Sequence, residues 1–185
     1  EDDLHGIVPG SKRARYWFVG GARTGTFLHV DPLCTSAWNV CVSGVKRWCM
    51  LSPETDLAPL GLDHFAQGKH QIAACWFLDE LPKLQALAAA GSLKMVEILQ
   101  TPGDLVFVPS GWHHAVLNLE WSCAISQNFM AAPALPAMWP RLTSGNYAFS
   151  RVLVDLLLHL RPSLVEELPP IAPPQQGNMP SATDG

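Results

Sequence analysis

The sequence predicts a mainly β protein, a sandwich or barrel of short strands with one helical insertion and a helical C-terminal part. Eight runs rich in Val, Ile, Phe and Trp, punctuated by Gly, Pro, Asn or Asp, predict strands. Strands joined by such short turns are typical of sandwiches and barrels. The 185 residues, 48% of them hydrophobic, are enough for one domain with a sizeable core.

The predicted elements divide the chain into four parts. Residues 1–15 are polar and irregular, and residues 16–130 form the strand-rich domain, interrupted by an insertion at about 52–93 with a helix that stops at Gly91. Residues 131–168 are helical, and the Pro-rich residues 169–185 are expected to be disordered. The strands are expected at RYWFVG, TFLHVD, SAWNVCV, KRWCML, KMVEIL, DLVFVP, WHHAVLNL and SCAISQNF.

Composition narrows the classes of partner. A formal net charge of −4 and a pI near 5.9 argue against a broad nucleic-acid surface and suit a basic peptide. The five cysteines show no C-x-x-C spacing, so we expect reduced thiols in an intracellular, soluble protein. Because the chain begins with Glu1, we expect a piece of a longer protein. The core is expected to contain Trp17, Trp38, Trp48 and Trp112.

The stretch FLHVDP contains the first candidate site residues, His29 and Asp31. In a strand, residues two apart point to the same face, so both side chains would meet at one spot. Such a pair is either a hydrogen-bonded couple in the core or two ligands of a metal. The pair by itself favours the core reading and leaves the metal reading open.

A second stretch, GDLVFVPSGWHHAVLN, places His113 and His114 near the start of a predicted strand. Strand alternation allows only one of these two histidines to face the interior that His29 faces. The residues alone do not say which of the two it is.

Four blocks in fixed order make the chain resemble the Jumonji-C oxygenases, the Fe(II)/2-oxoglutarate class of the cupin superfamily. The likeness runs from Tyr16 to Phe129 and is closest to the branch once named after the phosphatidylserine receptor, which includes bifunctional arginine demethylases and lysyl hydroxylases; related plant F-box proteins are similar. The blocks are GGARTGTFLHVDPLCTSAWN, GVKRWC, TPGDLVFVPSGWHHAVLNL and ISQNF.

The resemblance implies a double-stranded β-helix, or jelly roll, and the ligand set of an iron site. It selects His114 to complete a facial triad with His29 and Asp31, which leaves three positions free for 2-oxoglutarate and O2. The chain departs from this branch at His113, where relatives usually carry a second tryptophan. The N-terminal region of full-length relatives, which adds a contact to the cosubstrate, is expected to be missing here.

The resemblance also implies a cosubstrate pocket. Lys46 matches the position that pairs with the far carboxylate of 2-oxoglutarate, and Arg47 would face the opposite side. Strict alternation from His29 would turn Thr26 away from the pocket, so we expect an irregular strand near Gly25. The remaining matched pocket positions are Thr26, Asn39, Ser126 and Asn128.

The function that the resemblance implies is that of an Fe(II)- and 2-oxoglutarate-dependent protein oxygenase. We favour lysyl hydroxylation over demethylation of methyl-arginine. The expected substrate is a Lys/Arg-rich peptide of the histone-tail or splicing-factor type, and the expected location is the nucleus. The apolar stripe of residues 147–160 is expected to pack on the barrel or on a second subunit. The alternative is a non-catalytic cupin-like module that binds a peptide or scaffolds a complex.

Overall fold

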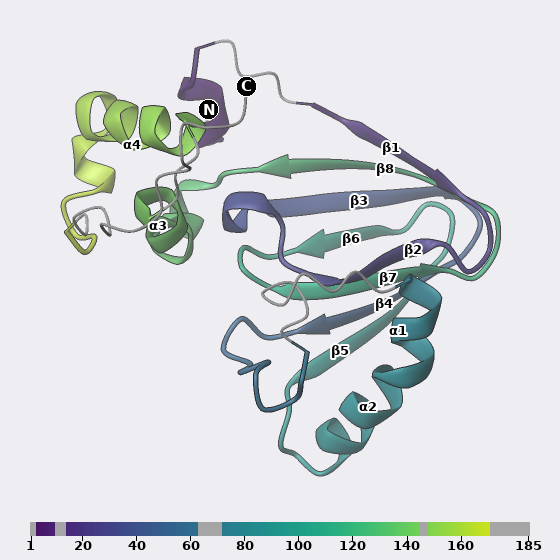
Figure 1. Cartoon of the computed structure of the whole chain (residues 1–185). Coiled ribbons are helices and arrows are strands. Elements are labelled where there is room, and N and C mark those ends of the chain that lie inside the picture. Colours follow the sequence, from purple (N-terminus) through teal and green to yellow (C-terminus); the bar gives the residue numbers. More distant parts are fainter. Residues whose placement is uncertain (1–2, 10–13, 63–71, 145–147, 171–185) are drawn as a thin grey trace, which may run out of the picture.

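Two antiparallel sheets of four strands each face one another in the computed structural model, which describes residues 3–9, 14–62, 72–144 and 148–170 (Figure 1). Each strand of the described part lies on one of the eight predicted runs, so the mainly β prediction is confirmed. The predicted disordered tail, except residues 169 and 170, lies outside the described residues.

The first sheet has the strand order β1-β8-β3-β6, and the second has the order β2-β7-β4-β5. Consecutive strands alternate between the two sheets, except that β4 and β5 are neighbours in the second sheet, and this interleaved order is that of a jelly roll. The strands of the first sheet are β1 (Tyr16–Gly20), β8 (Ser122–Phe129), β3 (Ser36–Ser43) and β6 (Leu105–Val108). The strands of the second sheet are β2 (Gly25–His29), β7 (His113–Asn118), β4 (Lys46–Leu51) and β5 (Met95–Gln100).

Two helices of the insertion cover the outer face of the second sheet (Figure 1). The predicted helix is α2 (Leu81–Ala89), which ends ahead of Gly91, whose φ of 75° is a left-handed conformation that favours glycine. The insertion contains a second helix, α1 (Ala73–Asp79), which the sequence did not predict. Trp76 of α1 is fully buried in the cluster that contains Leu51 of β4.

The C-terminal helices form a layer of their own at the end of the sheets away from α1 (Figure 1). The apolar stripe of α4 (Ala148–Leu160) packs in one cluster with α3 (Leu135–Ser144) and with the first short 3-10 helix, η1 (Leu4–Ile7). The shorter 3-10 helices are η2 (Pro32–Cys34), η3 (Ala132–Ala134) and η4 (Pro162–Leu164). Because the stripe is covered within the chain, a homodimer through it stays a prediction. None of the described helices combines the length and apolar character needed to cross a bilayer.

Apolar side chains are buried between the two sheets but exposed on the outer face of the first sheet. Trp48 is buried between the sheets, whereas Trp17 is 65% exposed, so its expected place in the core was wrong. The register pairs Trp17 with Ile125, which turns its side chain to the outer face, where Leu105 and Phe107 are exposed as well. Among the described residues no helix covers this face. The apolar side chains that meet between the sheets are Ala37, Trp48, Met50, Val106, Val108 and Val116.

Candidate metal centre and its cavity

A cavity of about 320 Å³ lies between the two sheets and is lined by strands from both. One end of the cavity lies at the end of β2 and the start of β7, and the other end lies at the start of β4 and the end of β7. All of the candidate site residues of the sequence line it: Thr26, His29, Asp31, Asn39, Lys46, His114, Ser126 and Asn128.

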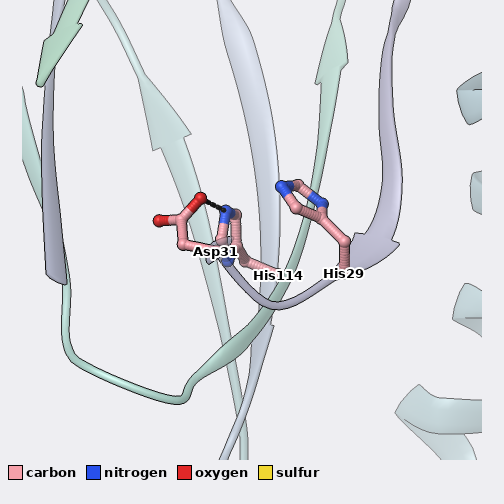
Figure 2. A group of neighbouring side chains, drawn as sticks. All are labelled: His29, Asp31 and His114. Atoms are coloured by element: carbon pink, nitrogen blue, oxygen red, sulfur yellow. Dashed lines mark ion pairs between the residues drawn. The ribbon is translucent and has the colours of Figure 1, made fainter. Parts of the chain in front are cut away.

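At one end the side chains of His29, Asp31 and His114 converge (Figure 2). His29 ends β2 and lies directly opposite His114 on β7, and their ring centroids are 4.2 Å apart. Asp31 follows two residues after His29, where the chain leaves the strand. One potential ligand atom from each residue lies within 4.8 Å of the other two, a spacing that suits a shared metal ion.

Backbone carbonyls fix both imidazole rings. The Nδ1 of His29 lies 2.8 Å from the carbonyl oxygen of Phe27, and the Nδ1 of His114 lies 3.2 Å from that of Trp112. Because a carbonyl only accepts hydrogen bonds, each Nδ1 carries the hydrogen, which leaves the lone pair on Nε2. This is the arrangement in which a histidine binds a metal through Nε2 while its other nitrogen is held.

The charges of the triad also fit a cation. Burial, and then the nearby His29, lower the pKa of His114 to about 3, so its ring is neutral at physiological pH. Burial raises the pKa of Asp31, while His29 and the amide of Asn128 oppose the rise. The 3.9 Å between His114 Nε2 and Asp31 Oδ1 is too long for a hydrogen bond (Figure 2).

One oxygen of this carboxylate has no partner. Asp31 Oδ2 is buried and accepts no hydrogen bond from any described residue. A buried carboxylate oxygen without a donor is costly, and a metal cation would satisfy it. The residues present therefore fit a divalent ion held by two neutral imidazoles and one carboxylate, the donor set that non-heme Fe(II) oxygenases use.

The structure distinguishes the two adjacent histidines. His114 lies across from His29 on one side and Met50 on the other, with its ring toward the cavity. His113 pairs with Leu51, does not line the cavity and is no member of the converging group. Burial, and then the positive charge of Arg141, lower the pKa of His113. Strand alternation separates two neighbouring residues of one type into a cavity position and a non-cavity position.

The opposite end of the cavity contains a buried ammonium group. Lys46 is 4% exposed, and its Nζ donates a hydrogen bond of 2.6 Å to Asn118 Oδ1. Burial lowers the pKa of Lys46, and the thiols of Cys41 and Cys123 oppose this. Within the described residues no carboxylate pairs with Lys46, so an anionic ligand would supply the missing negative charge. Its neighbour Arg47 points to the other face of β4.

Thr26 reaches the cavity because β2 is irregular, as the sequence predicted. The pairing of β2 with β7 shifts register between Thr26 and His29. Gly25 has a φ of 152°, and a Cβ atom at this position would collide with the carbonyl oxygen of Val116. The close approach of the two strands at Gly25 therefore requires glycine, and the shifted register turns Thr26 and His29 to the same side.

The other matched pocket residues line the cavity from the first sheet. Ser126 donates to the carbonyl oxygen of Trp38 at 2.7 Å, and Asn128 donates to Thr35 Oγ1 at 2.9 Å. Both residues lie on β8, two positions apart, and both face inward. Ser126 and Asn128 of β8, together with Asn39 of β3, thus line the cavity from the first sheet.

Sequence reasoning missed a buried amide, that of Gln100, which holds two residues lining the cavity, Trp48 and Asn39. Gln100 is fully buried, accepts a hydrogen bond of 2.9 Å from Trp48 Nε1 and donates one of 3.0 Å to the carbonyl oxygen of Asn39. Trp48 in turn stacks on His114, with ring centroids 6.1 Å apart and planes at 26°. The available signal was a polar residue at the last position of strand β5, whose other polar residue is Glu97. In the register Gln100 lies opposite Lys46.

Comparison with known proteins gives one family. A family model described as "JmjC domain, hydroxylase" matches residues 16–129. Similar proteins include the bifunctional arginine demethylase and lysyl-hydroxylase psr-1 of Caenorhabditis elegans, 37% identical over 172 residues. Two others are the arginine-specific demethylase JMJ22 of Arabidopsis thaliana, 34% identical over 130 residues, and the 2-oxoglutarate and iron-dependent oxygenase JMJD4 of Mus musculus, 32% identical over 127 residues.

The shared part is most of this chain and a minor part of the relatives. The alignment with psr-1 covers 90% of this chain and 42% of that protein. The alignments with JMJ22 and JMJD4 cover 69% and 68% of this chain, and 25% and 28% of the relatives. The chain thus spans less than half the length of these curated relatives.

Proposed function

The chain belongs to the JmjC hydroxylase family, and from that premise we propose that it is an Fe(II)- and 2-oxoglutarate-dependent protein oxygenase. One observation carries this proposal. A single cavity has three converging metal-ligating side chains at one end and, at the other, a buried lysine that pairs with no carboxylate of the described residues. A 2-oxo diacid offers a keto acid to the first and a carboxylate to the second.

In this proposal the triad holds the iron. Nε2 of His29, Nε2 of His114 and the carboxylate of Asp31 would be its ligands. Iron, when bound, couples the oxidative decarboxylation of 2-oxoglutarate by O2, to succinate and CO2, with the insertion of one oxygen atom into a substrate C–H bond. The hydrogen bonds from Nδ1 to backbone carbonyls keep both rings oriented before the metal arrives.

The rest of the cavity binds the cosubstrate and excludes water. Lys46 donates to the far carboxylate, and the polar side chains of Thr26, Asn39, Ser126 and Asn128 surround the diacid. The apolar walls that separate the two ends come from Trp48, Val108 and Val116. A low dielectric between the ends strengthens both the metal–carboxylate and the ammonium–carboxylate attraction.

For the substrate we favour the side chain of a lysine in a Lys/Arg-rich peptide, encountered in the nucleus. Support comes from the name of psr-1, which includes lysyl hydroxylation, and from the net charge of −4 of this chain. Demethylation is the second candidate, because psr-1 and JMJ22 are both named for acting on arginine. Hydroxylation of an N-methyl carbon gives a hemiaminal that loses formaldehyde, so one active site serves both reactions.

Mass spectrometry of one basic peptide, prepared with and without methyl-arginine, tests the proposal. We expect a gain of about 16 Da on lysine that requires Fe(II) and 2-oxoglutarate. His114→Ala should abolish the product, while the adjacent His113→Ala should retain it. Loss of methyl groups with stoichiometric formaldehyde and no hydroxylysine would reverse the order of the two reactions. If neither product forms, even with a chain of the relatives' full length, the peptide-binding module is the better account.

A further inference from the structure

Three side-chain hydrogen bonds connect the buried lysine to the turn between β1 and β2. Lys46 Nζ donates to Asn118 Oδ1 at 2.6 Å, and Asn118 Nδ2 donates to Thr24 Oγ1 at 2.9 Å. Thr24 Oγ1 donates in turn to the carbonyl oxygen of Gly21 at 2.7 Å. The chain of bonds starts inside the cavity and ends on backbone in the turn.

The direction of every bond in this chain is determined. The Thr24 hydroxyl gives its hydrogen to Gly21, so towards Asn118 it can only accept, and the NH2 of Asn118 must face it. The oxygen of the same amide then faces Lys46, which can only donate. The amide orientation is therefore fixed from both sides.

The backbone holds Asn118 in the same place. Its N–H donates to the carbonyl oxygen of Thr24 at 2.8 Å, and its carbonyl accepts from the N–H of Arg23 at 2.7 Å. Lys46 and Asn118 are direct partners in the register of β4 and β7, and Asn118 is only 5% exposed. Asn118 is thus a rigid point from which the long, flexible lysine side chain is held.

We propose that Asn118, held by Thr24, is the positioning residue that fixes Lys46 and thereby sets the length of diacid that the cavity accepts. An ammonium group has three donors, and Asn118 takes one, which leaves two for the oxygens of a carboxylate. The metal end is fixed by backbone carbonyls, so fixing the ammonium sets the span between the two ends. The inference rests on the proposed use of 2-oxoglutarate. It adds that the fixed position of Lys46 selects 2-oxoglutarate over shorter or longer 2-oxo diacids.

The role of Asn118 is tested by measuring the equilibrium binding of 2-oxoglutarate to the chain with Mn(II) in place of iron, so that no turnover occurs. For Asn118→Ala we expect about tenfold weaker binding of 2-oxoglutarate, the effect of losing one hydrogen bond to a charged group. Mn(II) affinity should be unchanged. Discrimination between 2-oxoglutarate and the one-carbon-longer 2-oxoadipate should shrink, because a released lysine can adopt other rotamers. General structural damage would weaken both diacids equally.

Substitutions at Thr24 and Gly20 should disturb the Lys46–Asn118 hydrogen bond while leaving both of these residues in the sequence. Thr24→Val removes the hydroxyl and should reproduce the Asn118→Ala effects, whereas Thr24→Ser keeps the hydroxyl and should restore parental behaviour. Gly20→Ala would place a Cβ 2.5 Å from Thr24 Oγ1 and 2.7 Å from Asn118 Nδ2, so it should displace both and have the same consequence. Gly20 does not have a positive φ, so alanine fits the backbone there.

Arg47→Ala is the matched control, because it removes a cation from the residue next to Lys46 on the opposite face of β4. It should leave diacid affinity and selectivity as in the parent. Parental affinity and parental selectivity in both Asn118→Ala and Thr24→Val, with cooperative thermal unfolding retained, would overturn the inference. A parent chain that binds Mn(II) but no 2-oxoglutarate would instead overturn the proposed function, and the inference with it.

Discussion

The two ends of the cavity hold their polar groups by different means. At the metal end, each histidine donates to a backbone carbonyl two residues earlier in its own segment. At the lysine end, Lys46 depends on the side chains of Asn118 and Thr24, which come from β7 and from the β1–β2 turn. The first arrangement is local in sequence, and the second needs three distant segments in register.

This difference has a physical consequence for substitution. A carbonyl oxygen is present whatever side chain its residue carries, so neighbours of the two histidines can change without releasing the rings. An amide or hydroxyl belongs to one residue type, so the lysine end tolerates few replacements. We therefore expect metal binding to be sensitive mainly to substitution of the ligands themselves, and diacid binding to be sensitive also to substitution of the residues that support Lys46.

The largest effect is expected at the metal end, from Asp31→Ala. Loss of the carboxylate ligand should weaken binding of Mn(II) or Fe(II) by at least about 100-fold, more than the loss of a residue that merely supports a ligand. The metal-free variant should be at least as stable as the parent, because Asp31 Oδ2 is buried without a donor. Metal titration and thermal unfolding measure the two. A variant that is markedly less stable without metal would indicate a structural role for Asp31.

The next effect is expected at the lysine end, from Lys46→Ala. Removing one partner of a buried charge pair costs about 2–5 kcal/mol, so 2-oxoglutarate should bind at least about 30-fold more weakly. The affinity for the metal should stay the same, since Lys46 is no part of the converging group. Titration of 2-oxoglutarate in the presence of Mn(II) gives the ratio. Equal affinity in variant and parent would mean that Lys46 does not contact the diacid.

A smaller effect, felt at both ends, is expected from Gln100→Leu. The change leaves Trp48 Nε1 without its acceptor, and an unsatisfied buried group costs about 1–3 kcal/mol. Because Gln100 also holds Asn39 and Trp48 stacks on His114, both metal and diacid should bind somewhat more weakly. Gln85→Leu, the same change in α2, is the matched control for stability. A loss of affinity for the metal alone, or for the diacid alone, would show that Gln100 does not support both ends of the cavity.

The smallest effect is expected from Phe27→Leu, which changes a side chain and leaves the supporting carbonyl in place. Metal affinity should remain within about twofold of the parent, since similar apolar replacements are well tolerated. Thr24→Val, the corresponding change at the lysine end, should cost about tenfold in diacid affinity. A Phe27→Leu variant with strongly reduced metal affinity would remove the distinction between the two ends.

The same distinction explains what the sequence could predict. The eight strands follow from patterns within single segments, and the structure shows them. His29 and Asp31 converge as expected, although Asp31 lies just past the end of β2. The irregular strand near Gly25, which alternation predicts only together with the family resemblance, is also present. The choice between His113 and His114 stayed open because alternation fixes only that they differ. It was the family resemblance that selected His114.

What depends on register between distant strands was not accessible from the sequence. Nothing local in the chain says that Gln100 lies opposite Lys46, or that Asn118 lies between Lys46 and Thr24. The outward direction of Trp17 was missed for the same reason, because the pairing of β1 with β8 sets it. Sequence reasoning thus found the residues that match the family motifs, and it missed Gln100 and Asn118, which support them.

Formation of succinate from 2-oxoglutarate is the most direct test of the central claim, that the two ends act together on one cosubstrate. The chain, supplied with Fe(II), O2 and a Lys/Arg-rich peptide, should convert 2-oxoglutarate to succinate. Asp31→Ala should form none, and Lys46→Ala should need at least about 30-fold more 2-oxoglutarate to approach the parental rate. Absence of succinate from a parent chain that binds both metal and 2-oxoglutarate, or an undiminished rate in Asp31→Ala, would contradict the account.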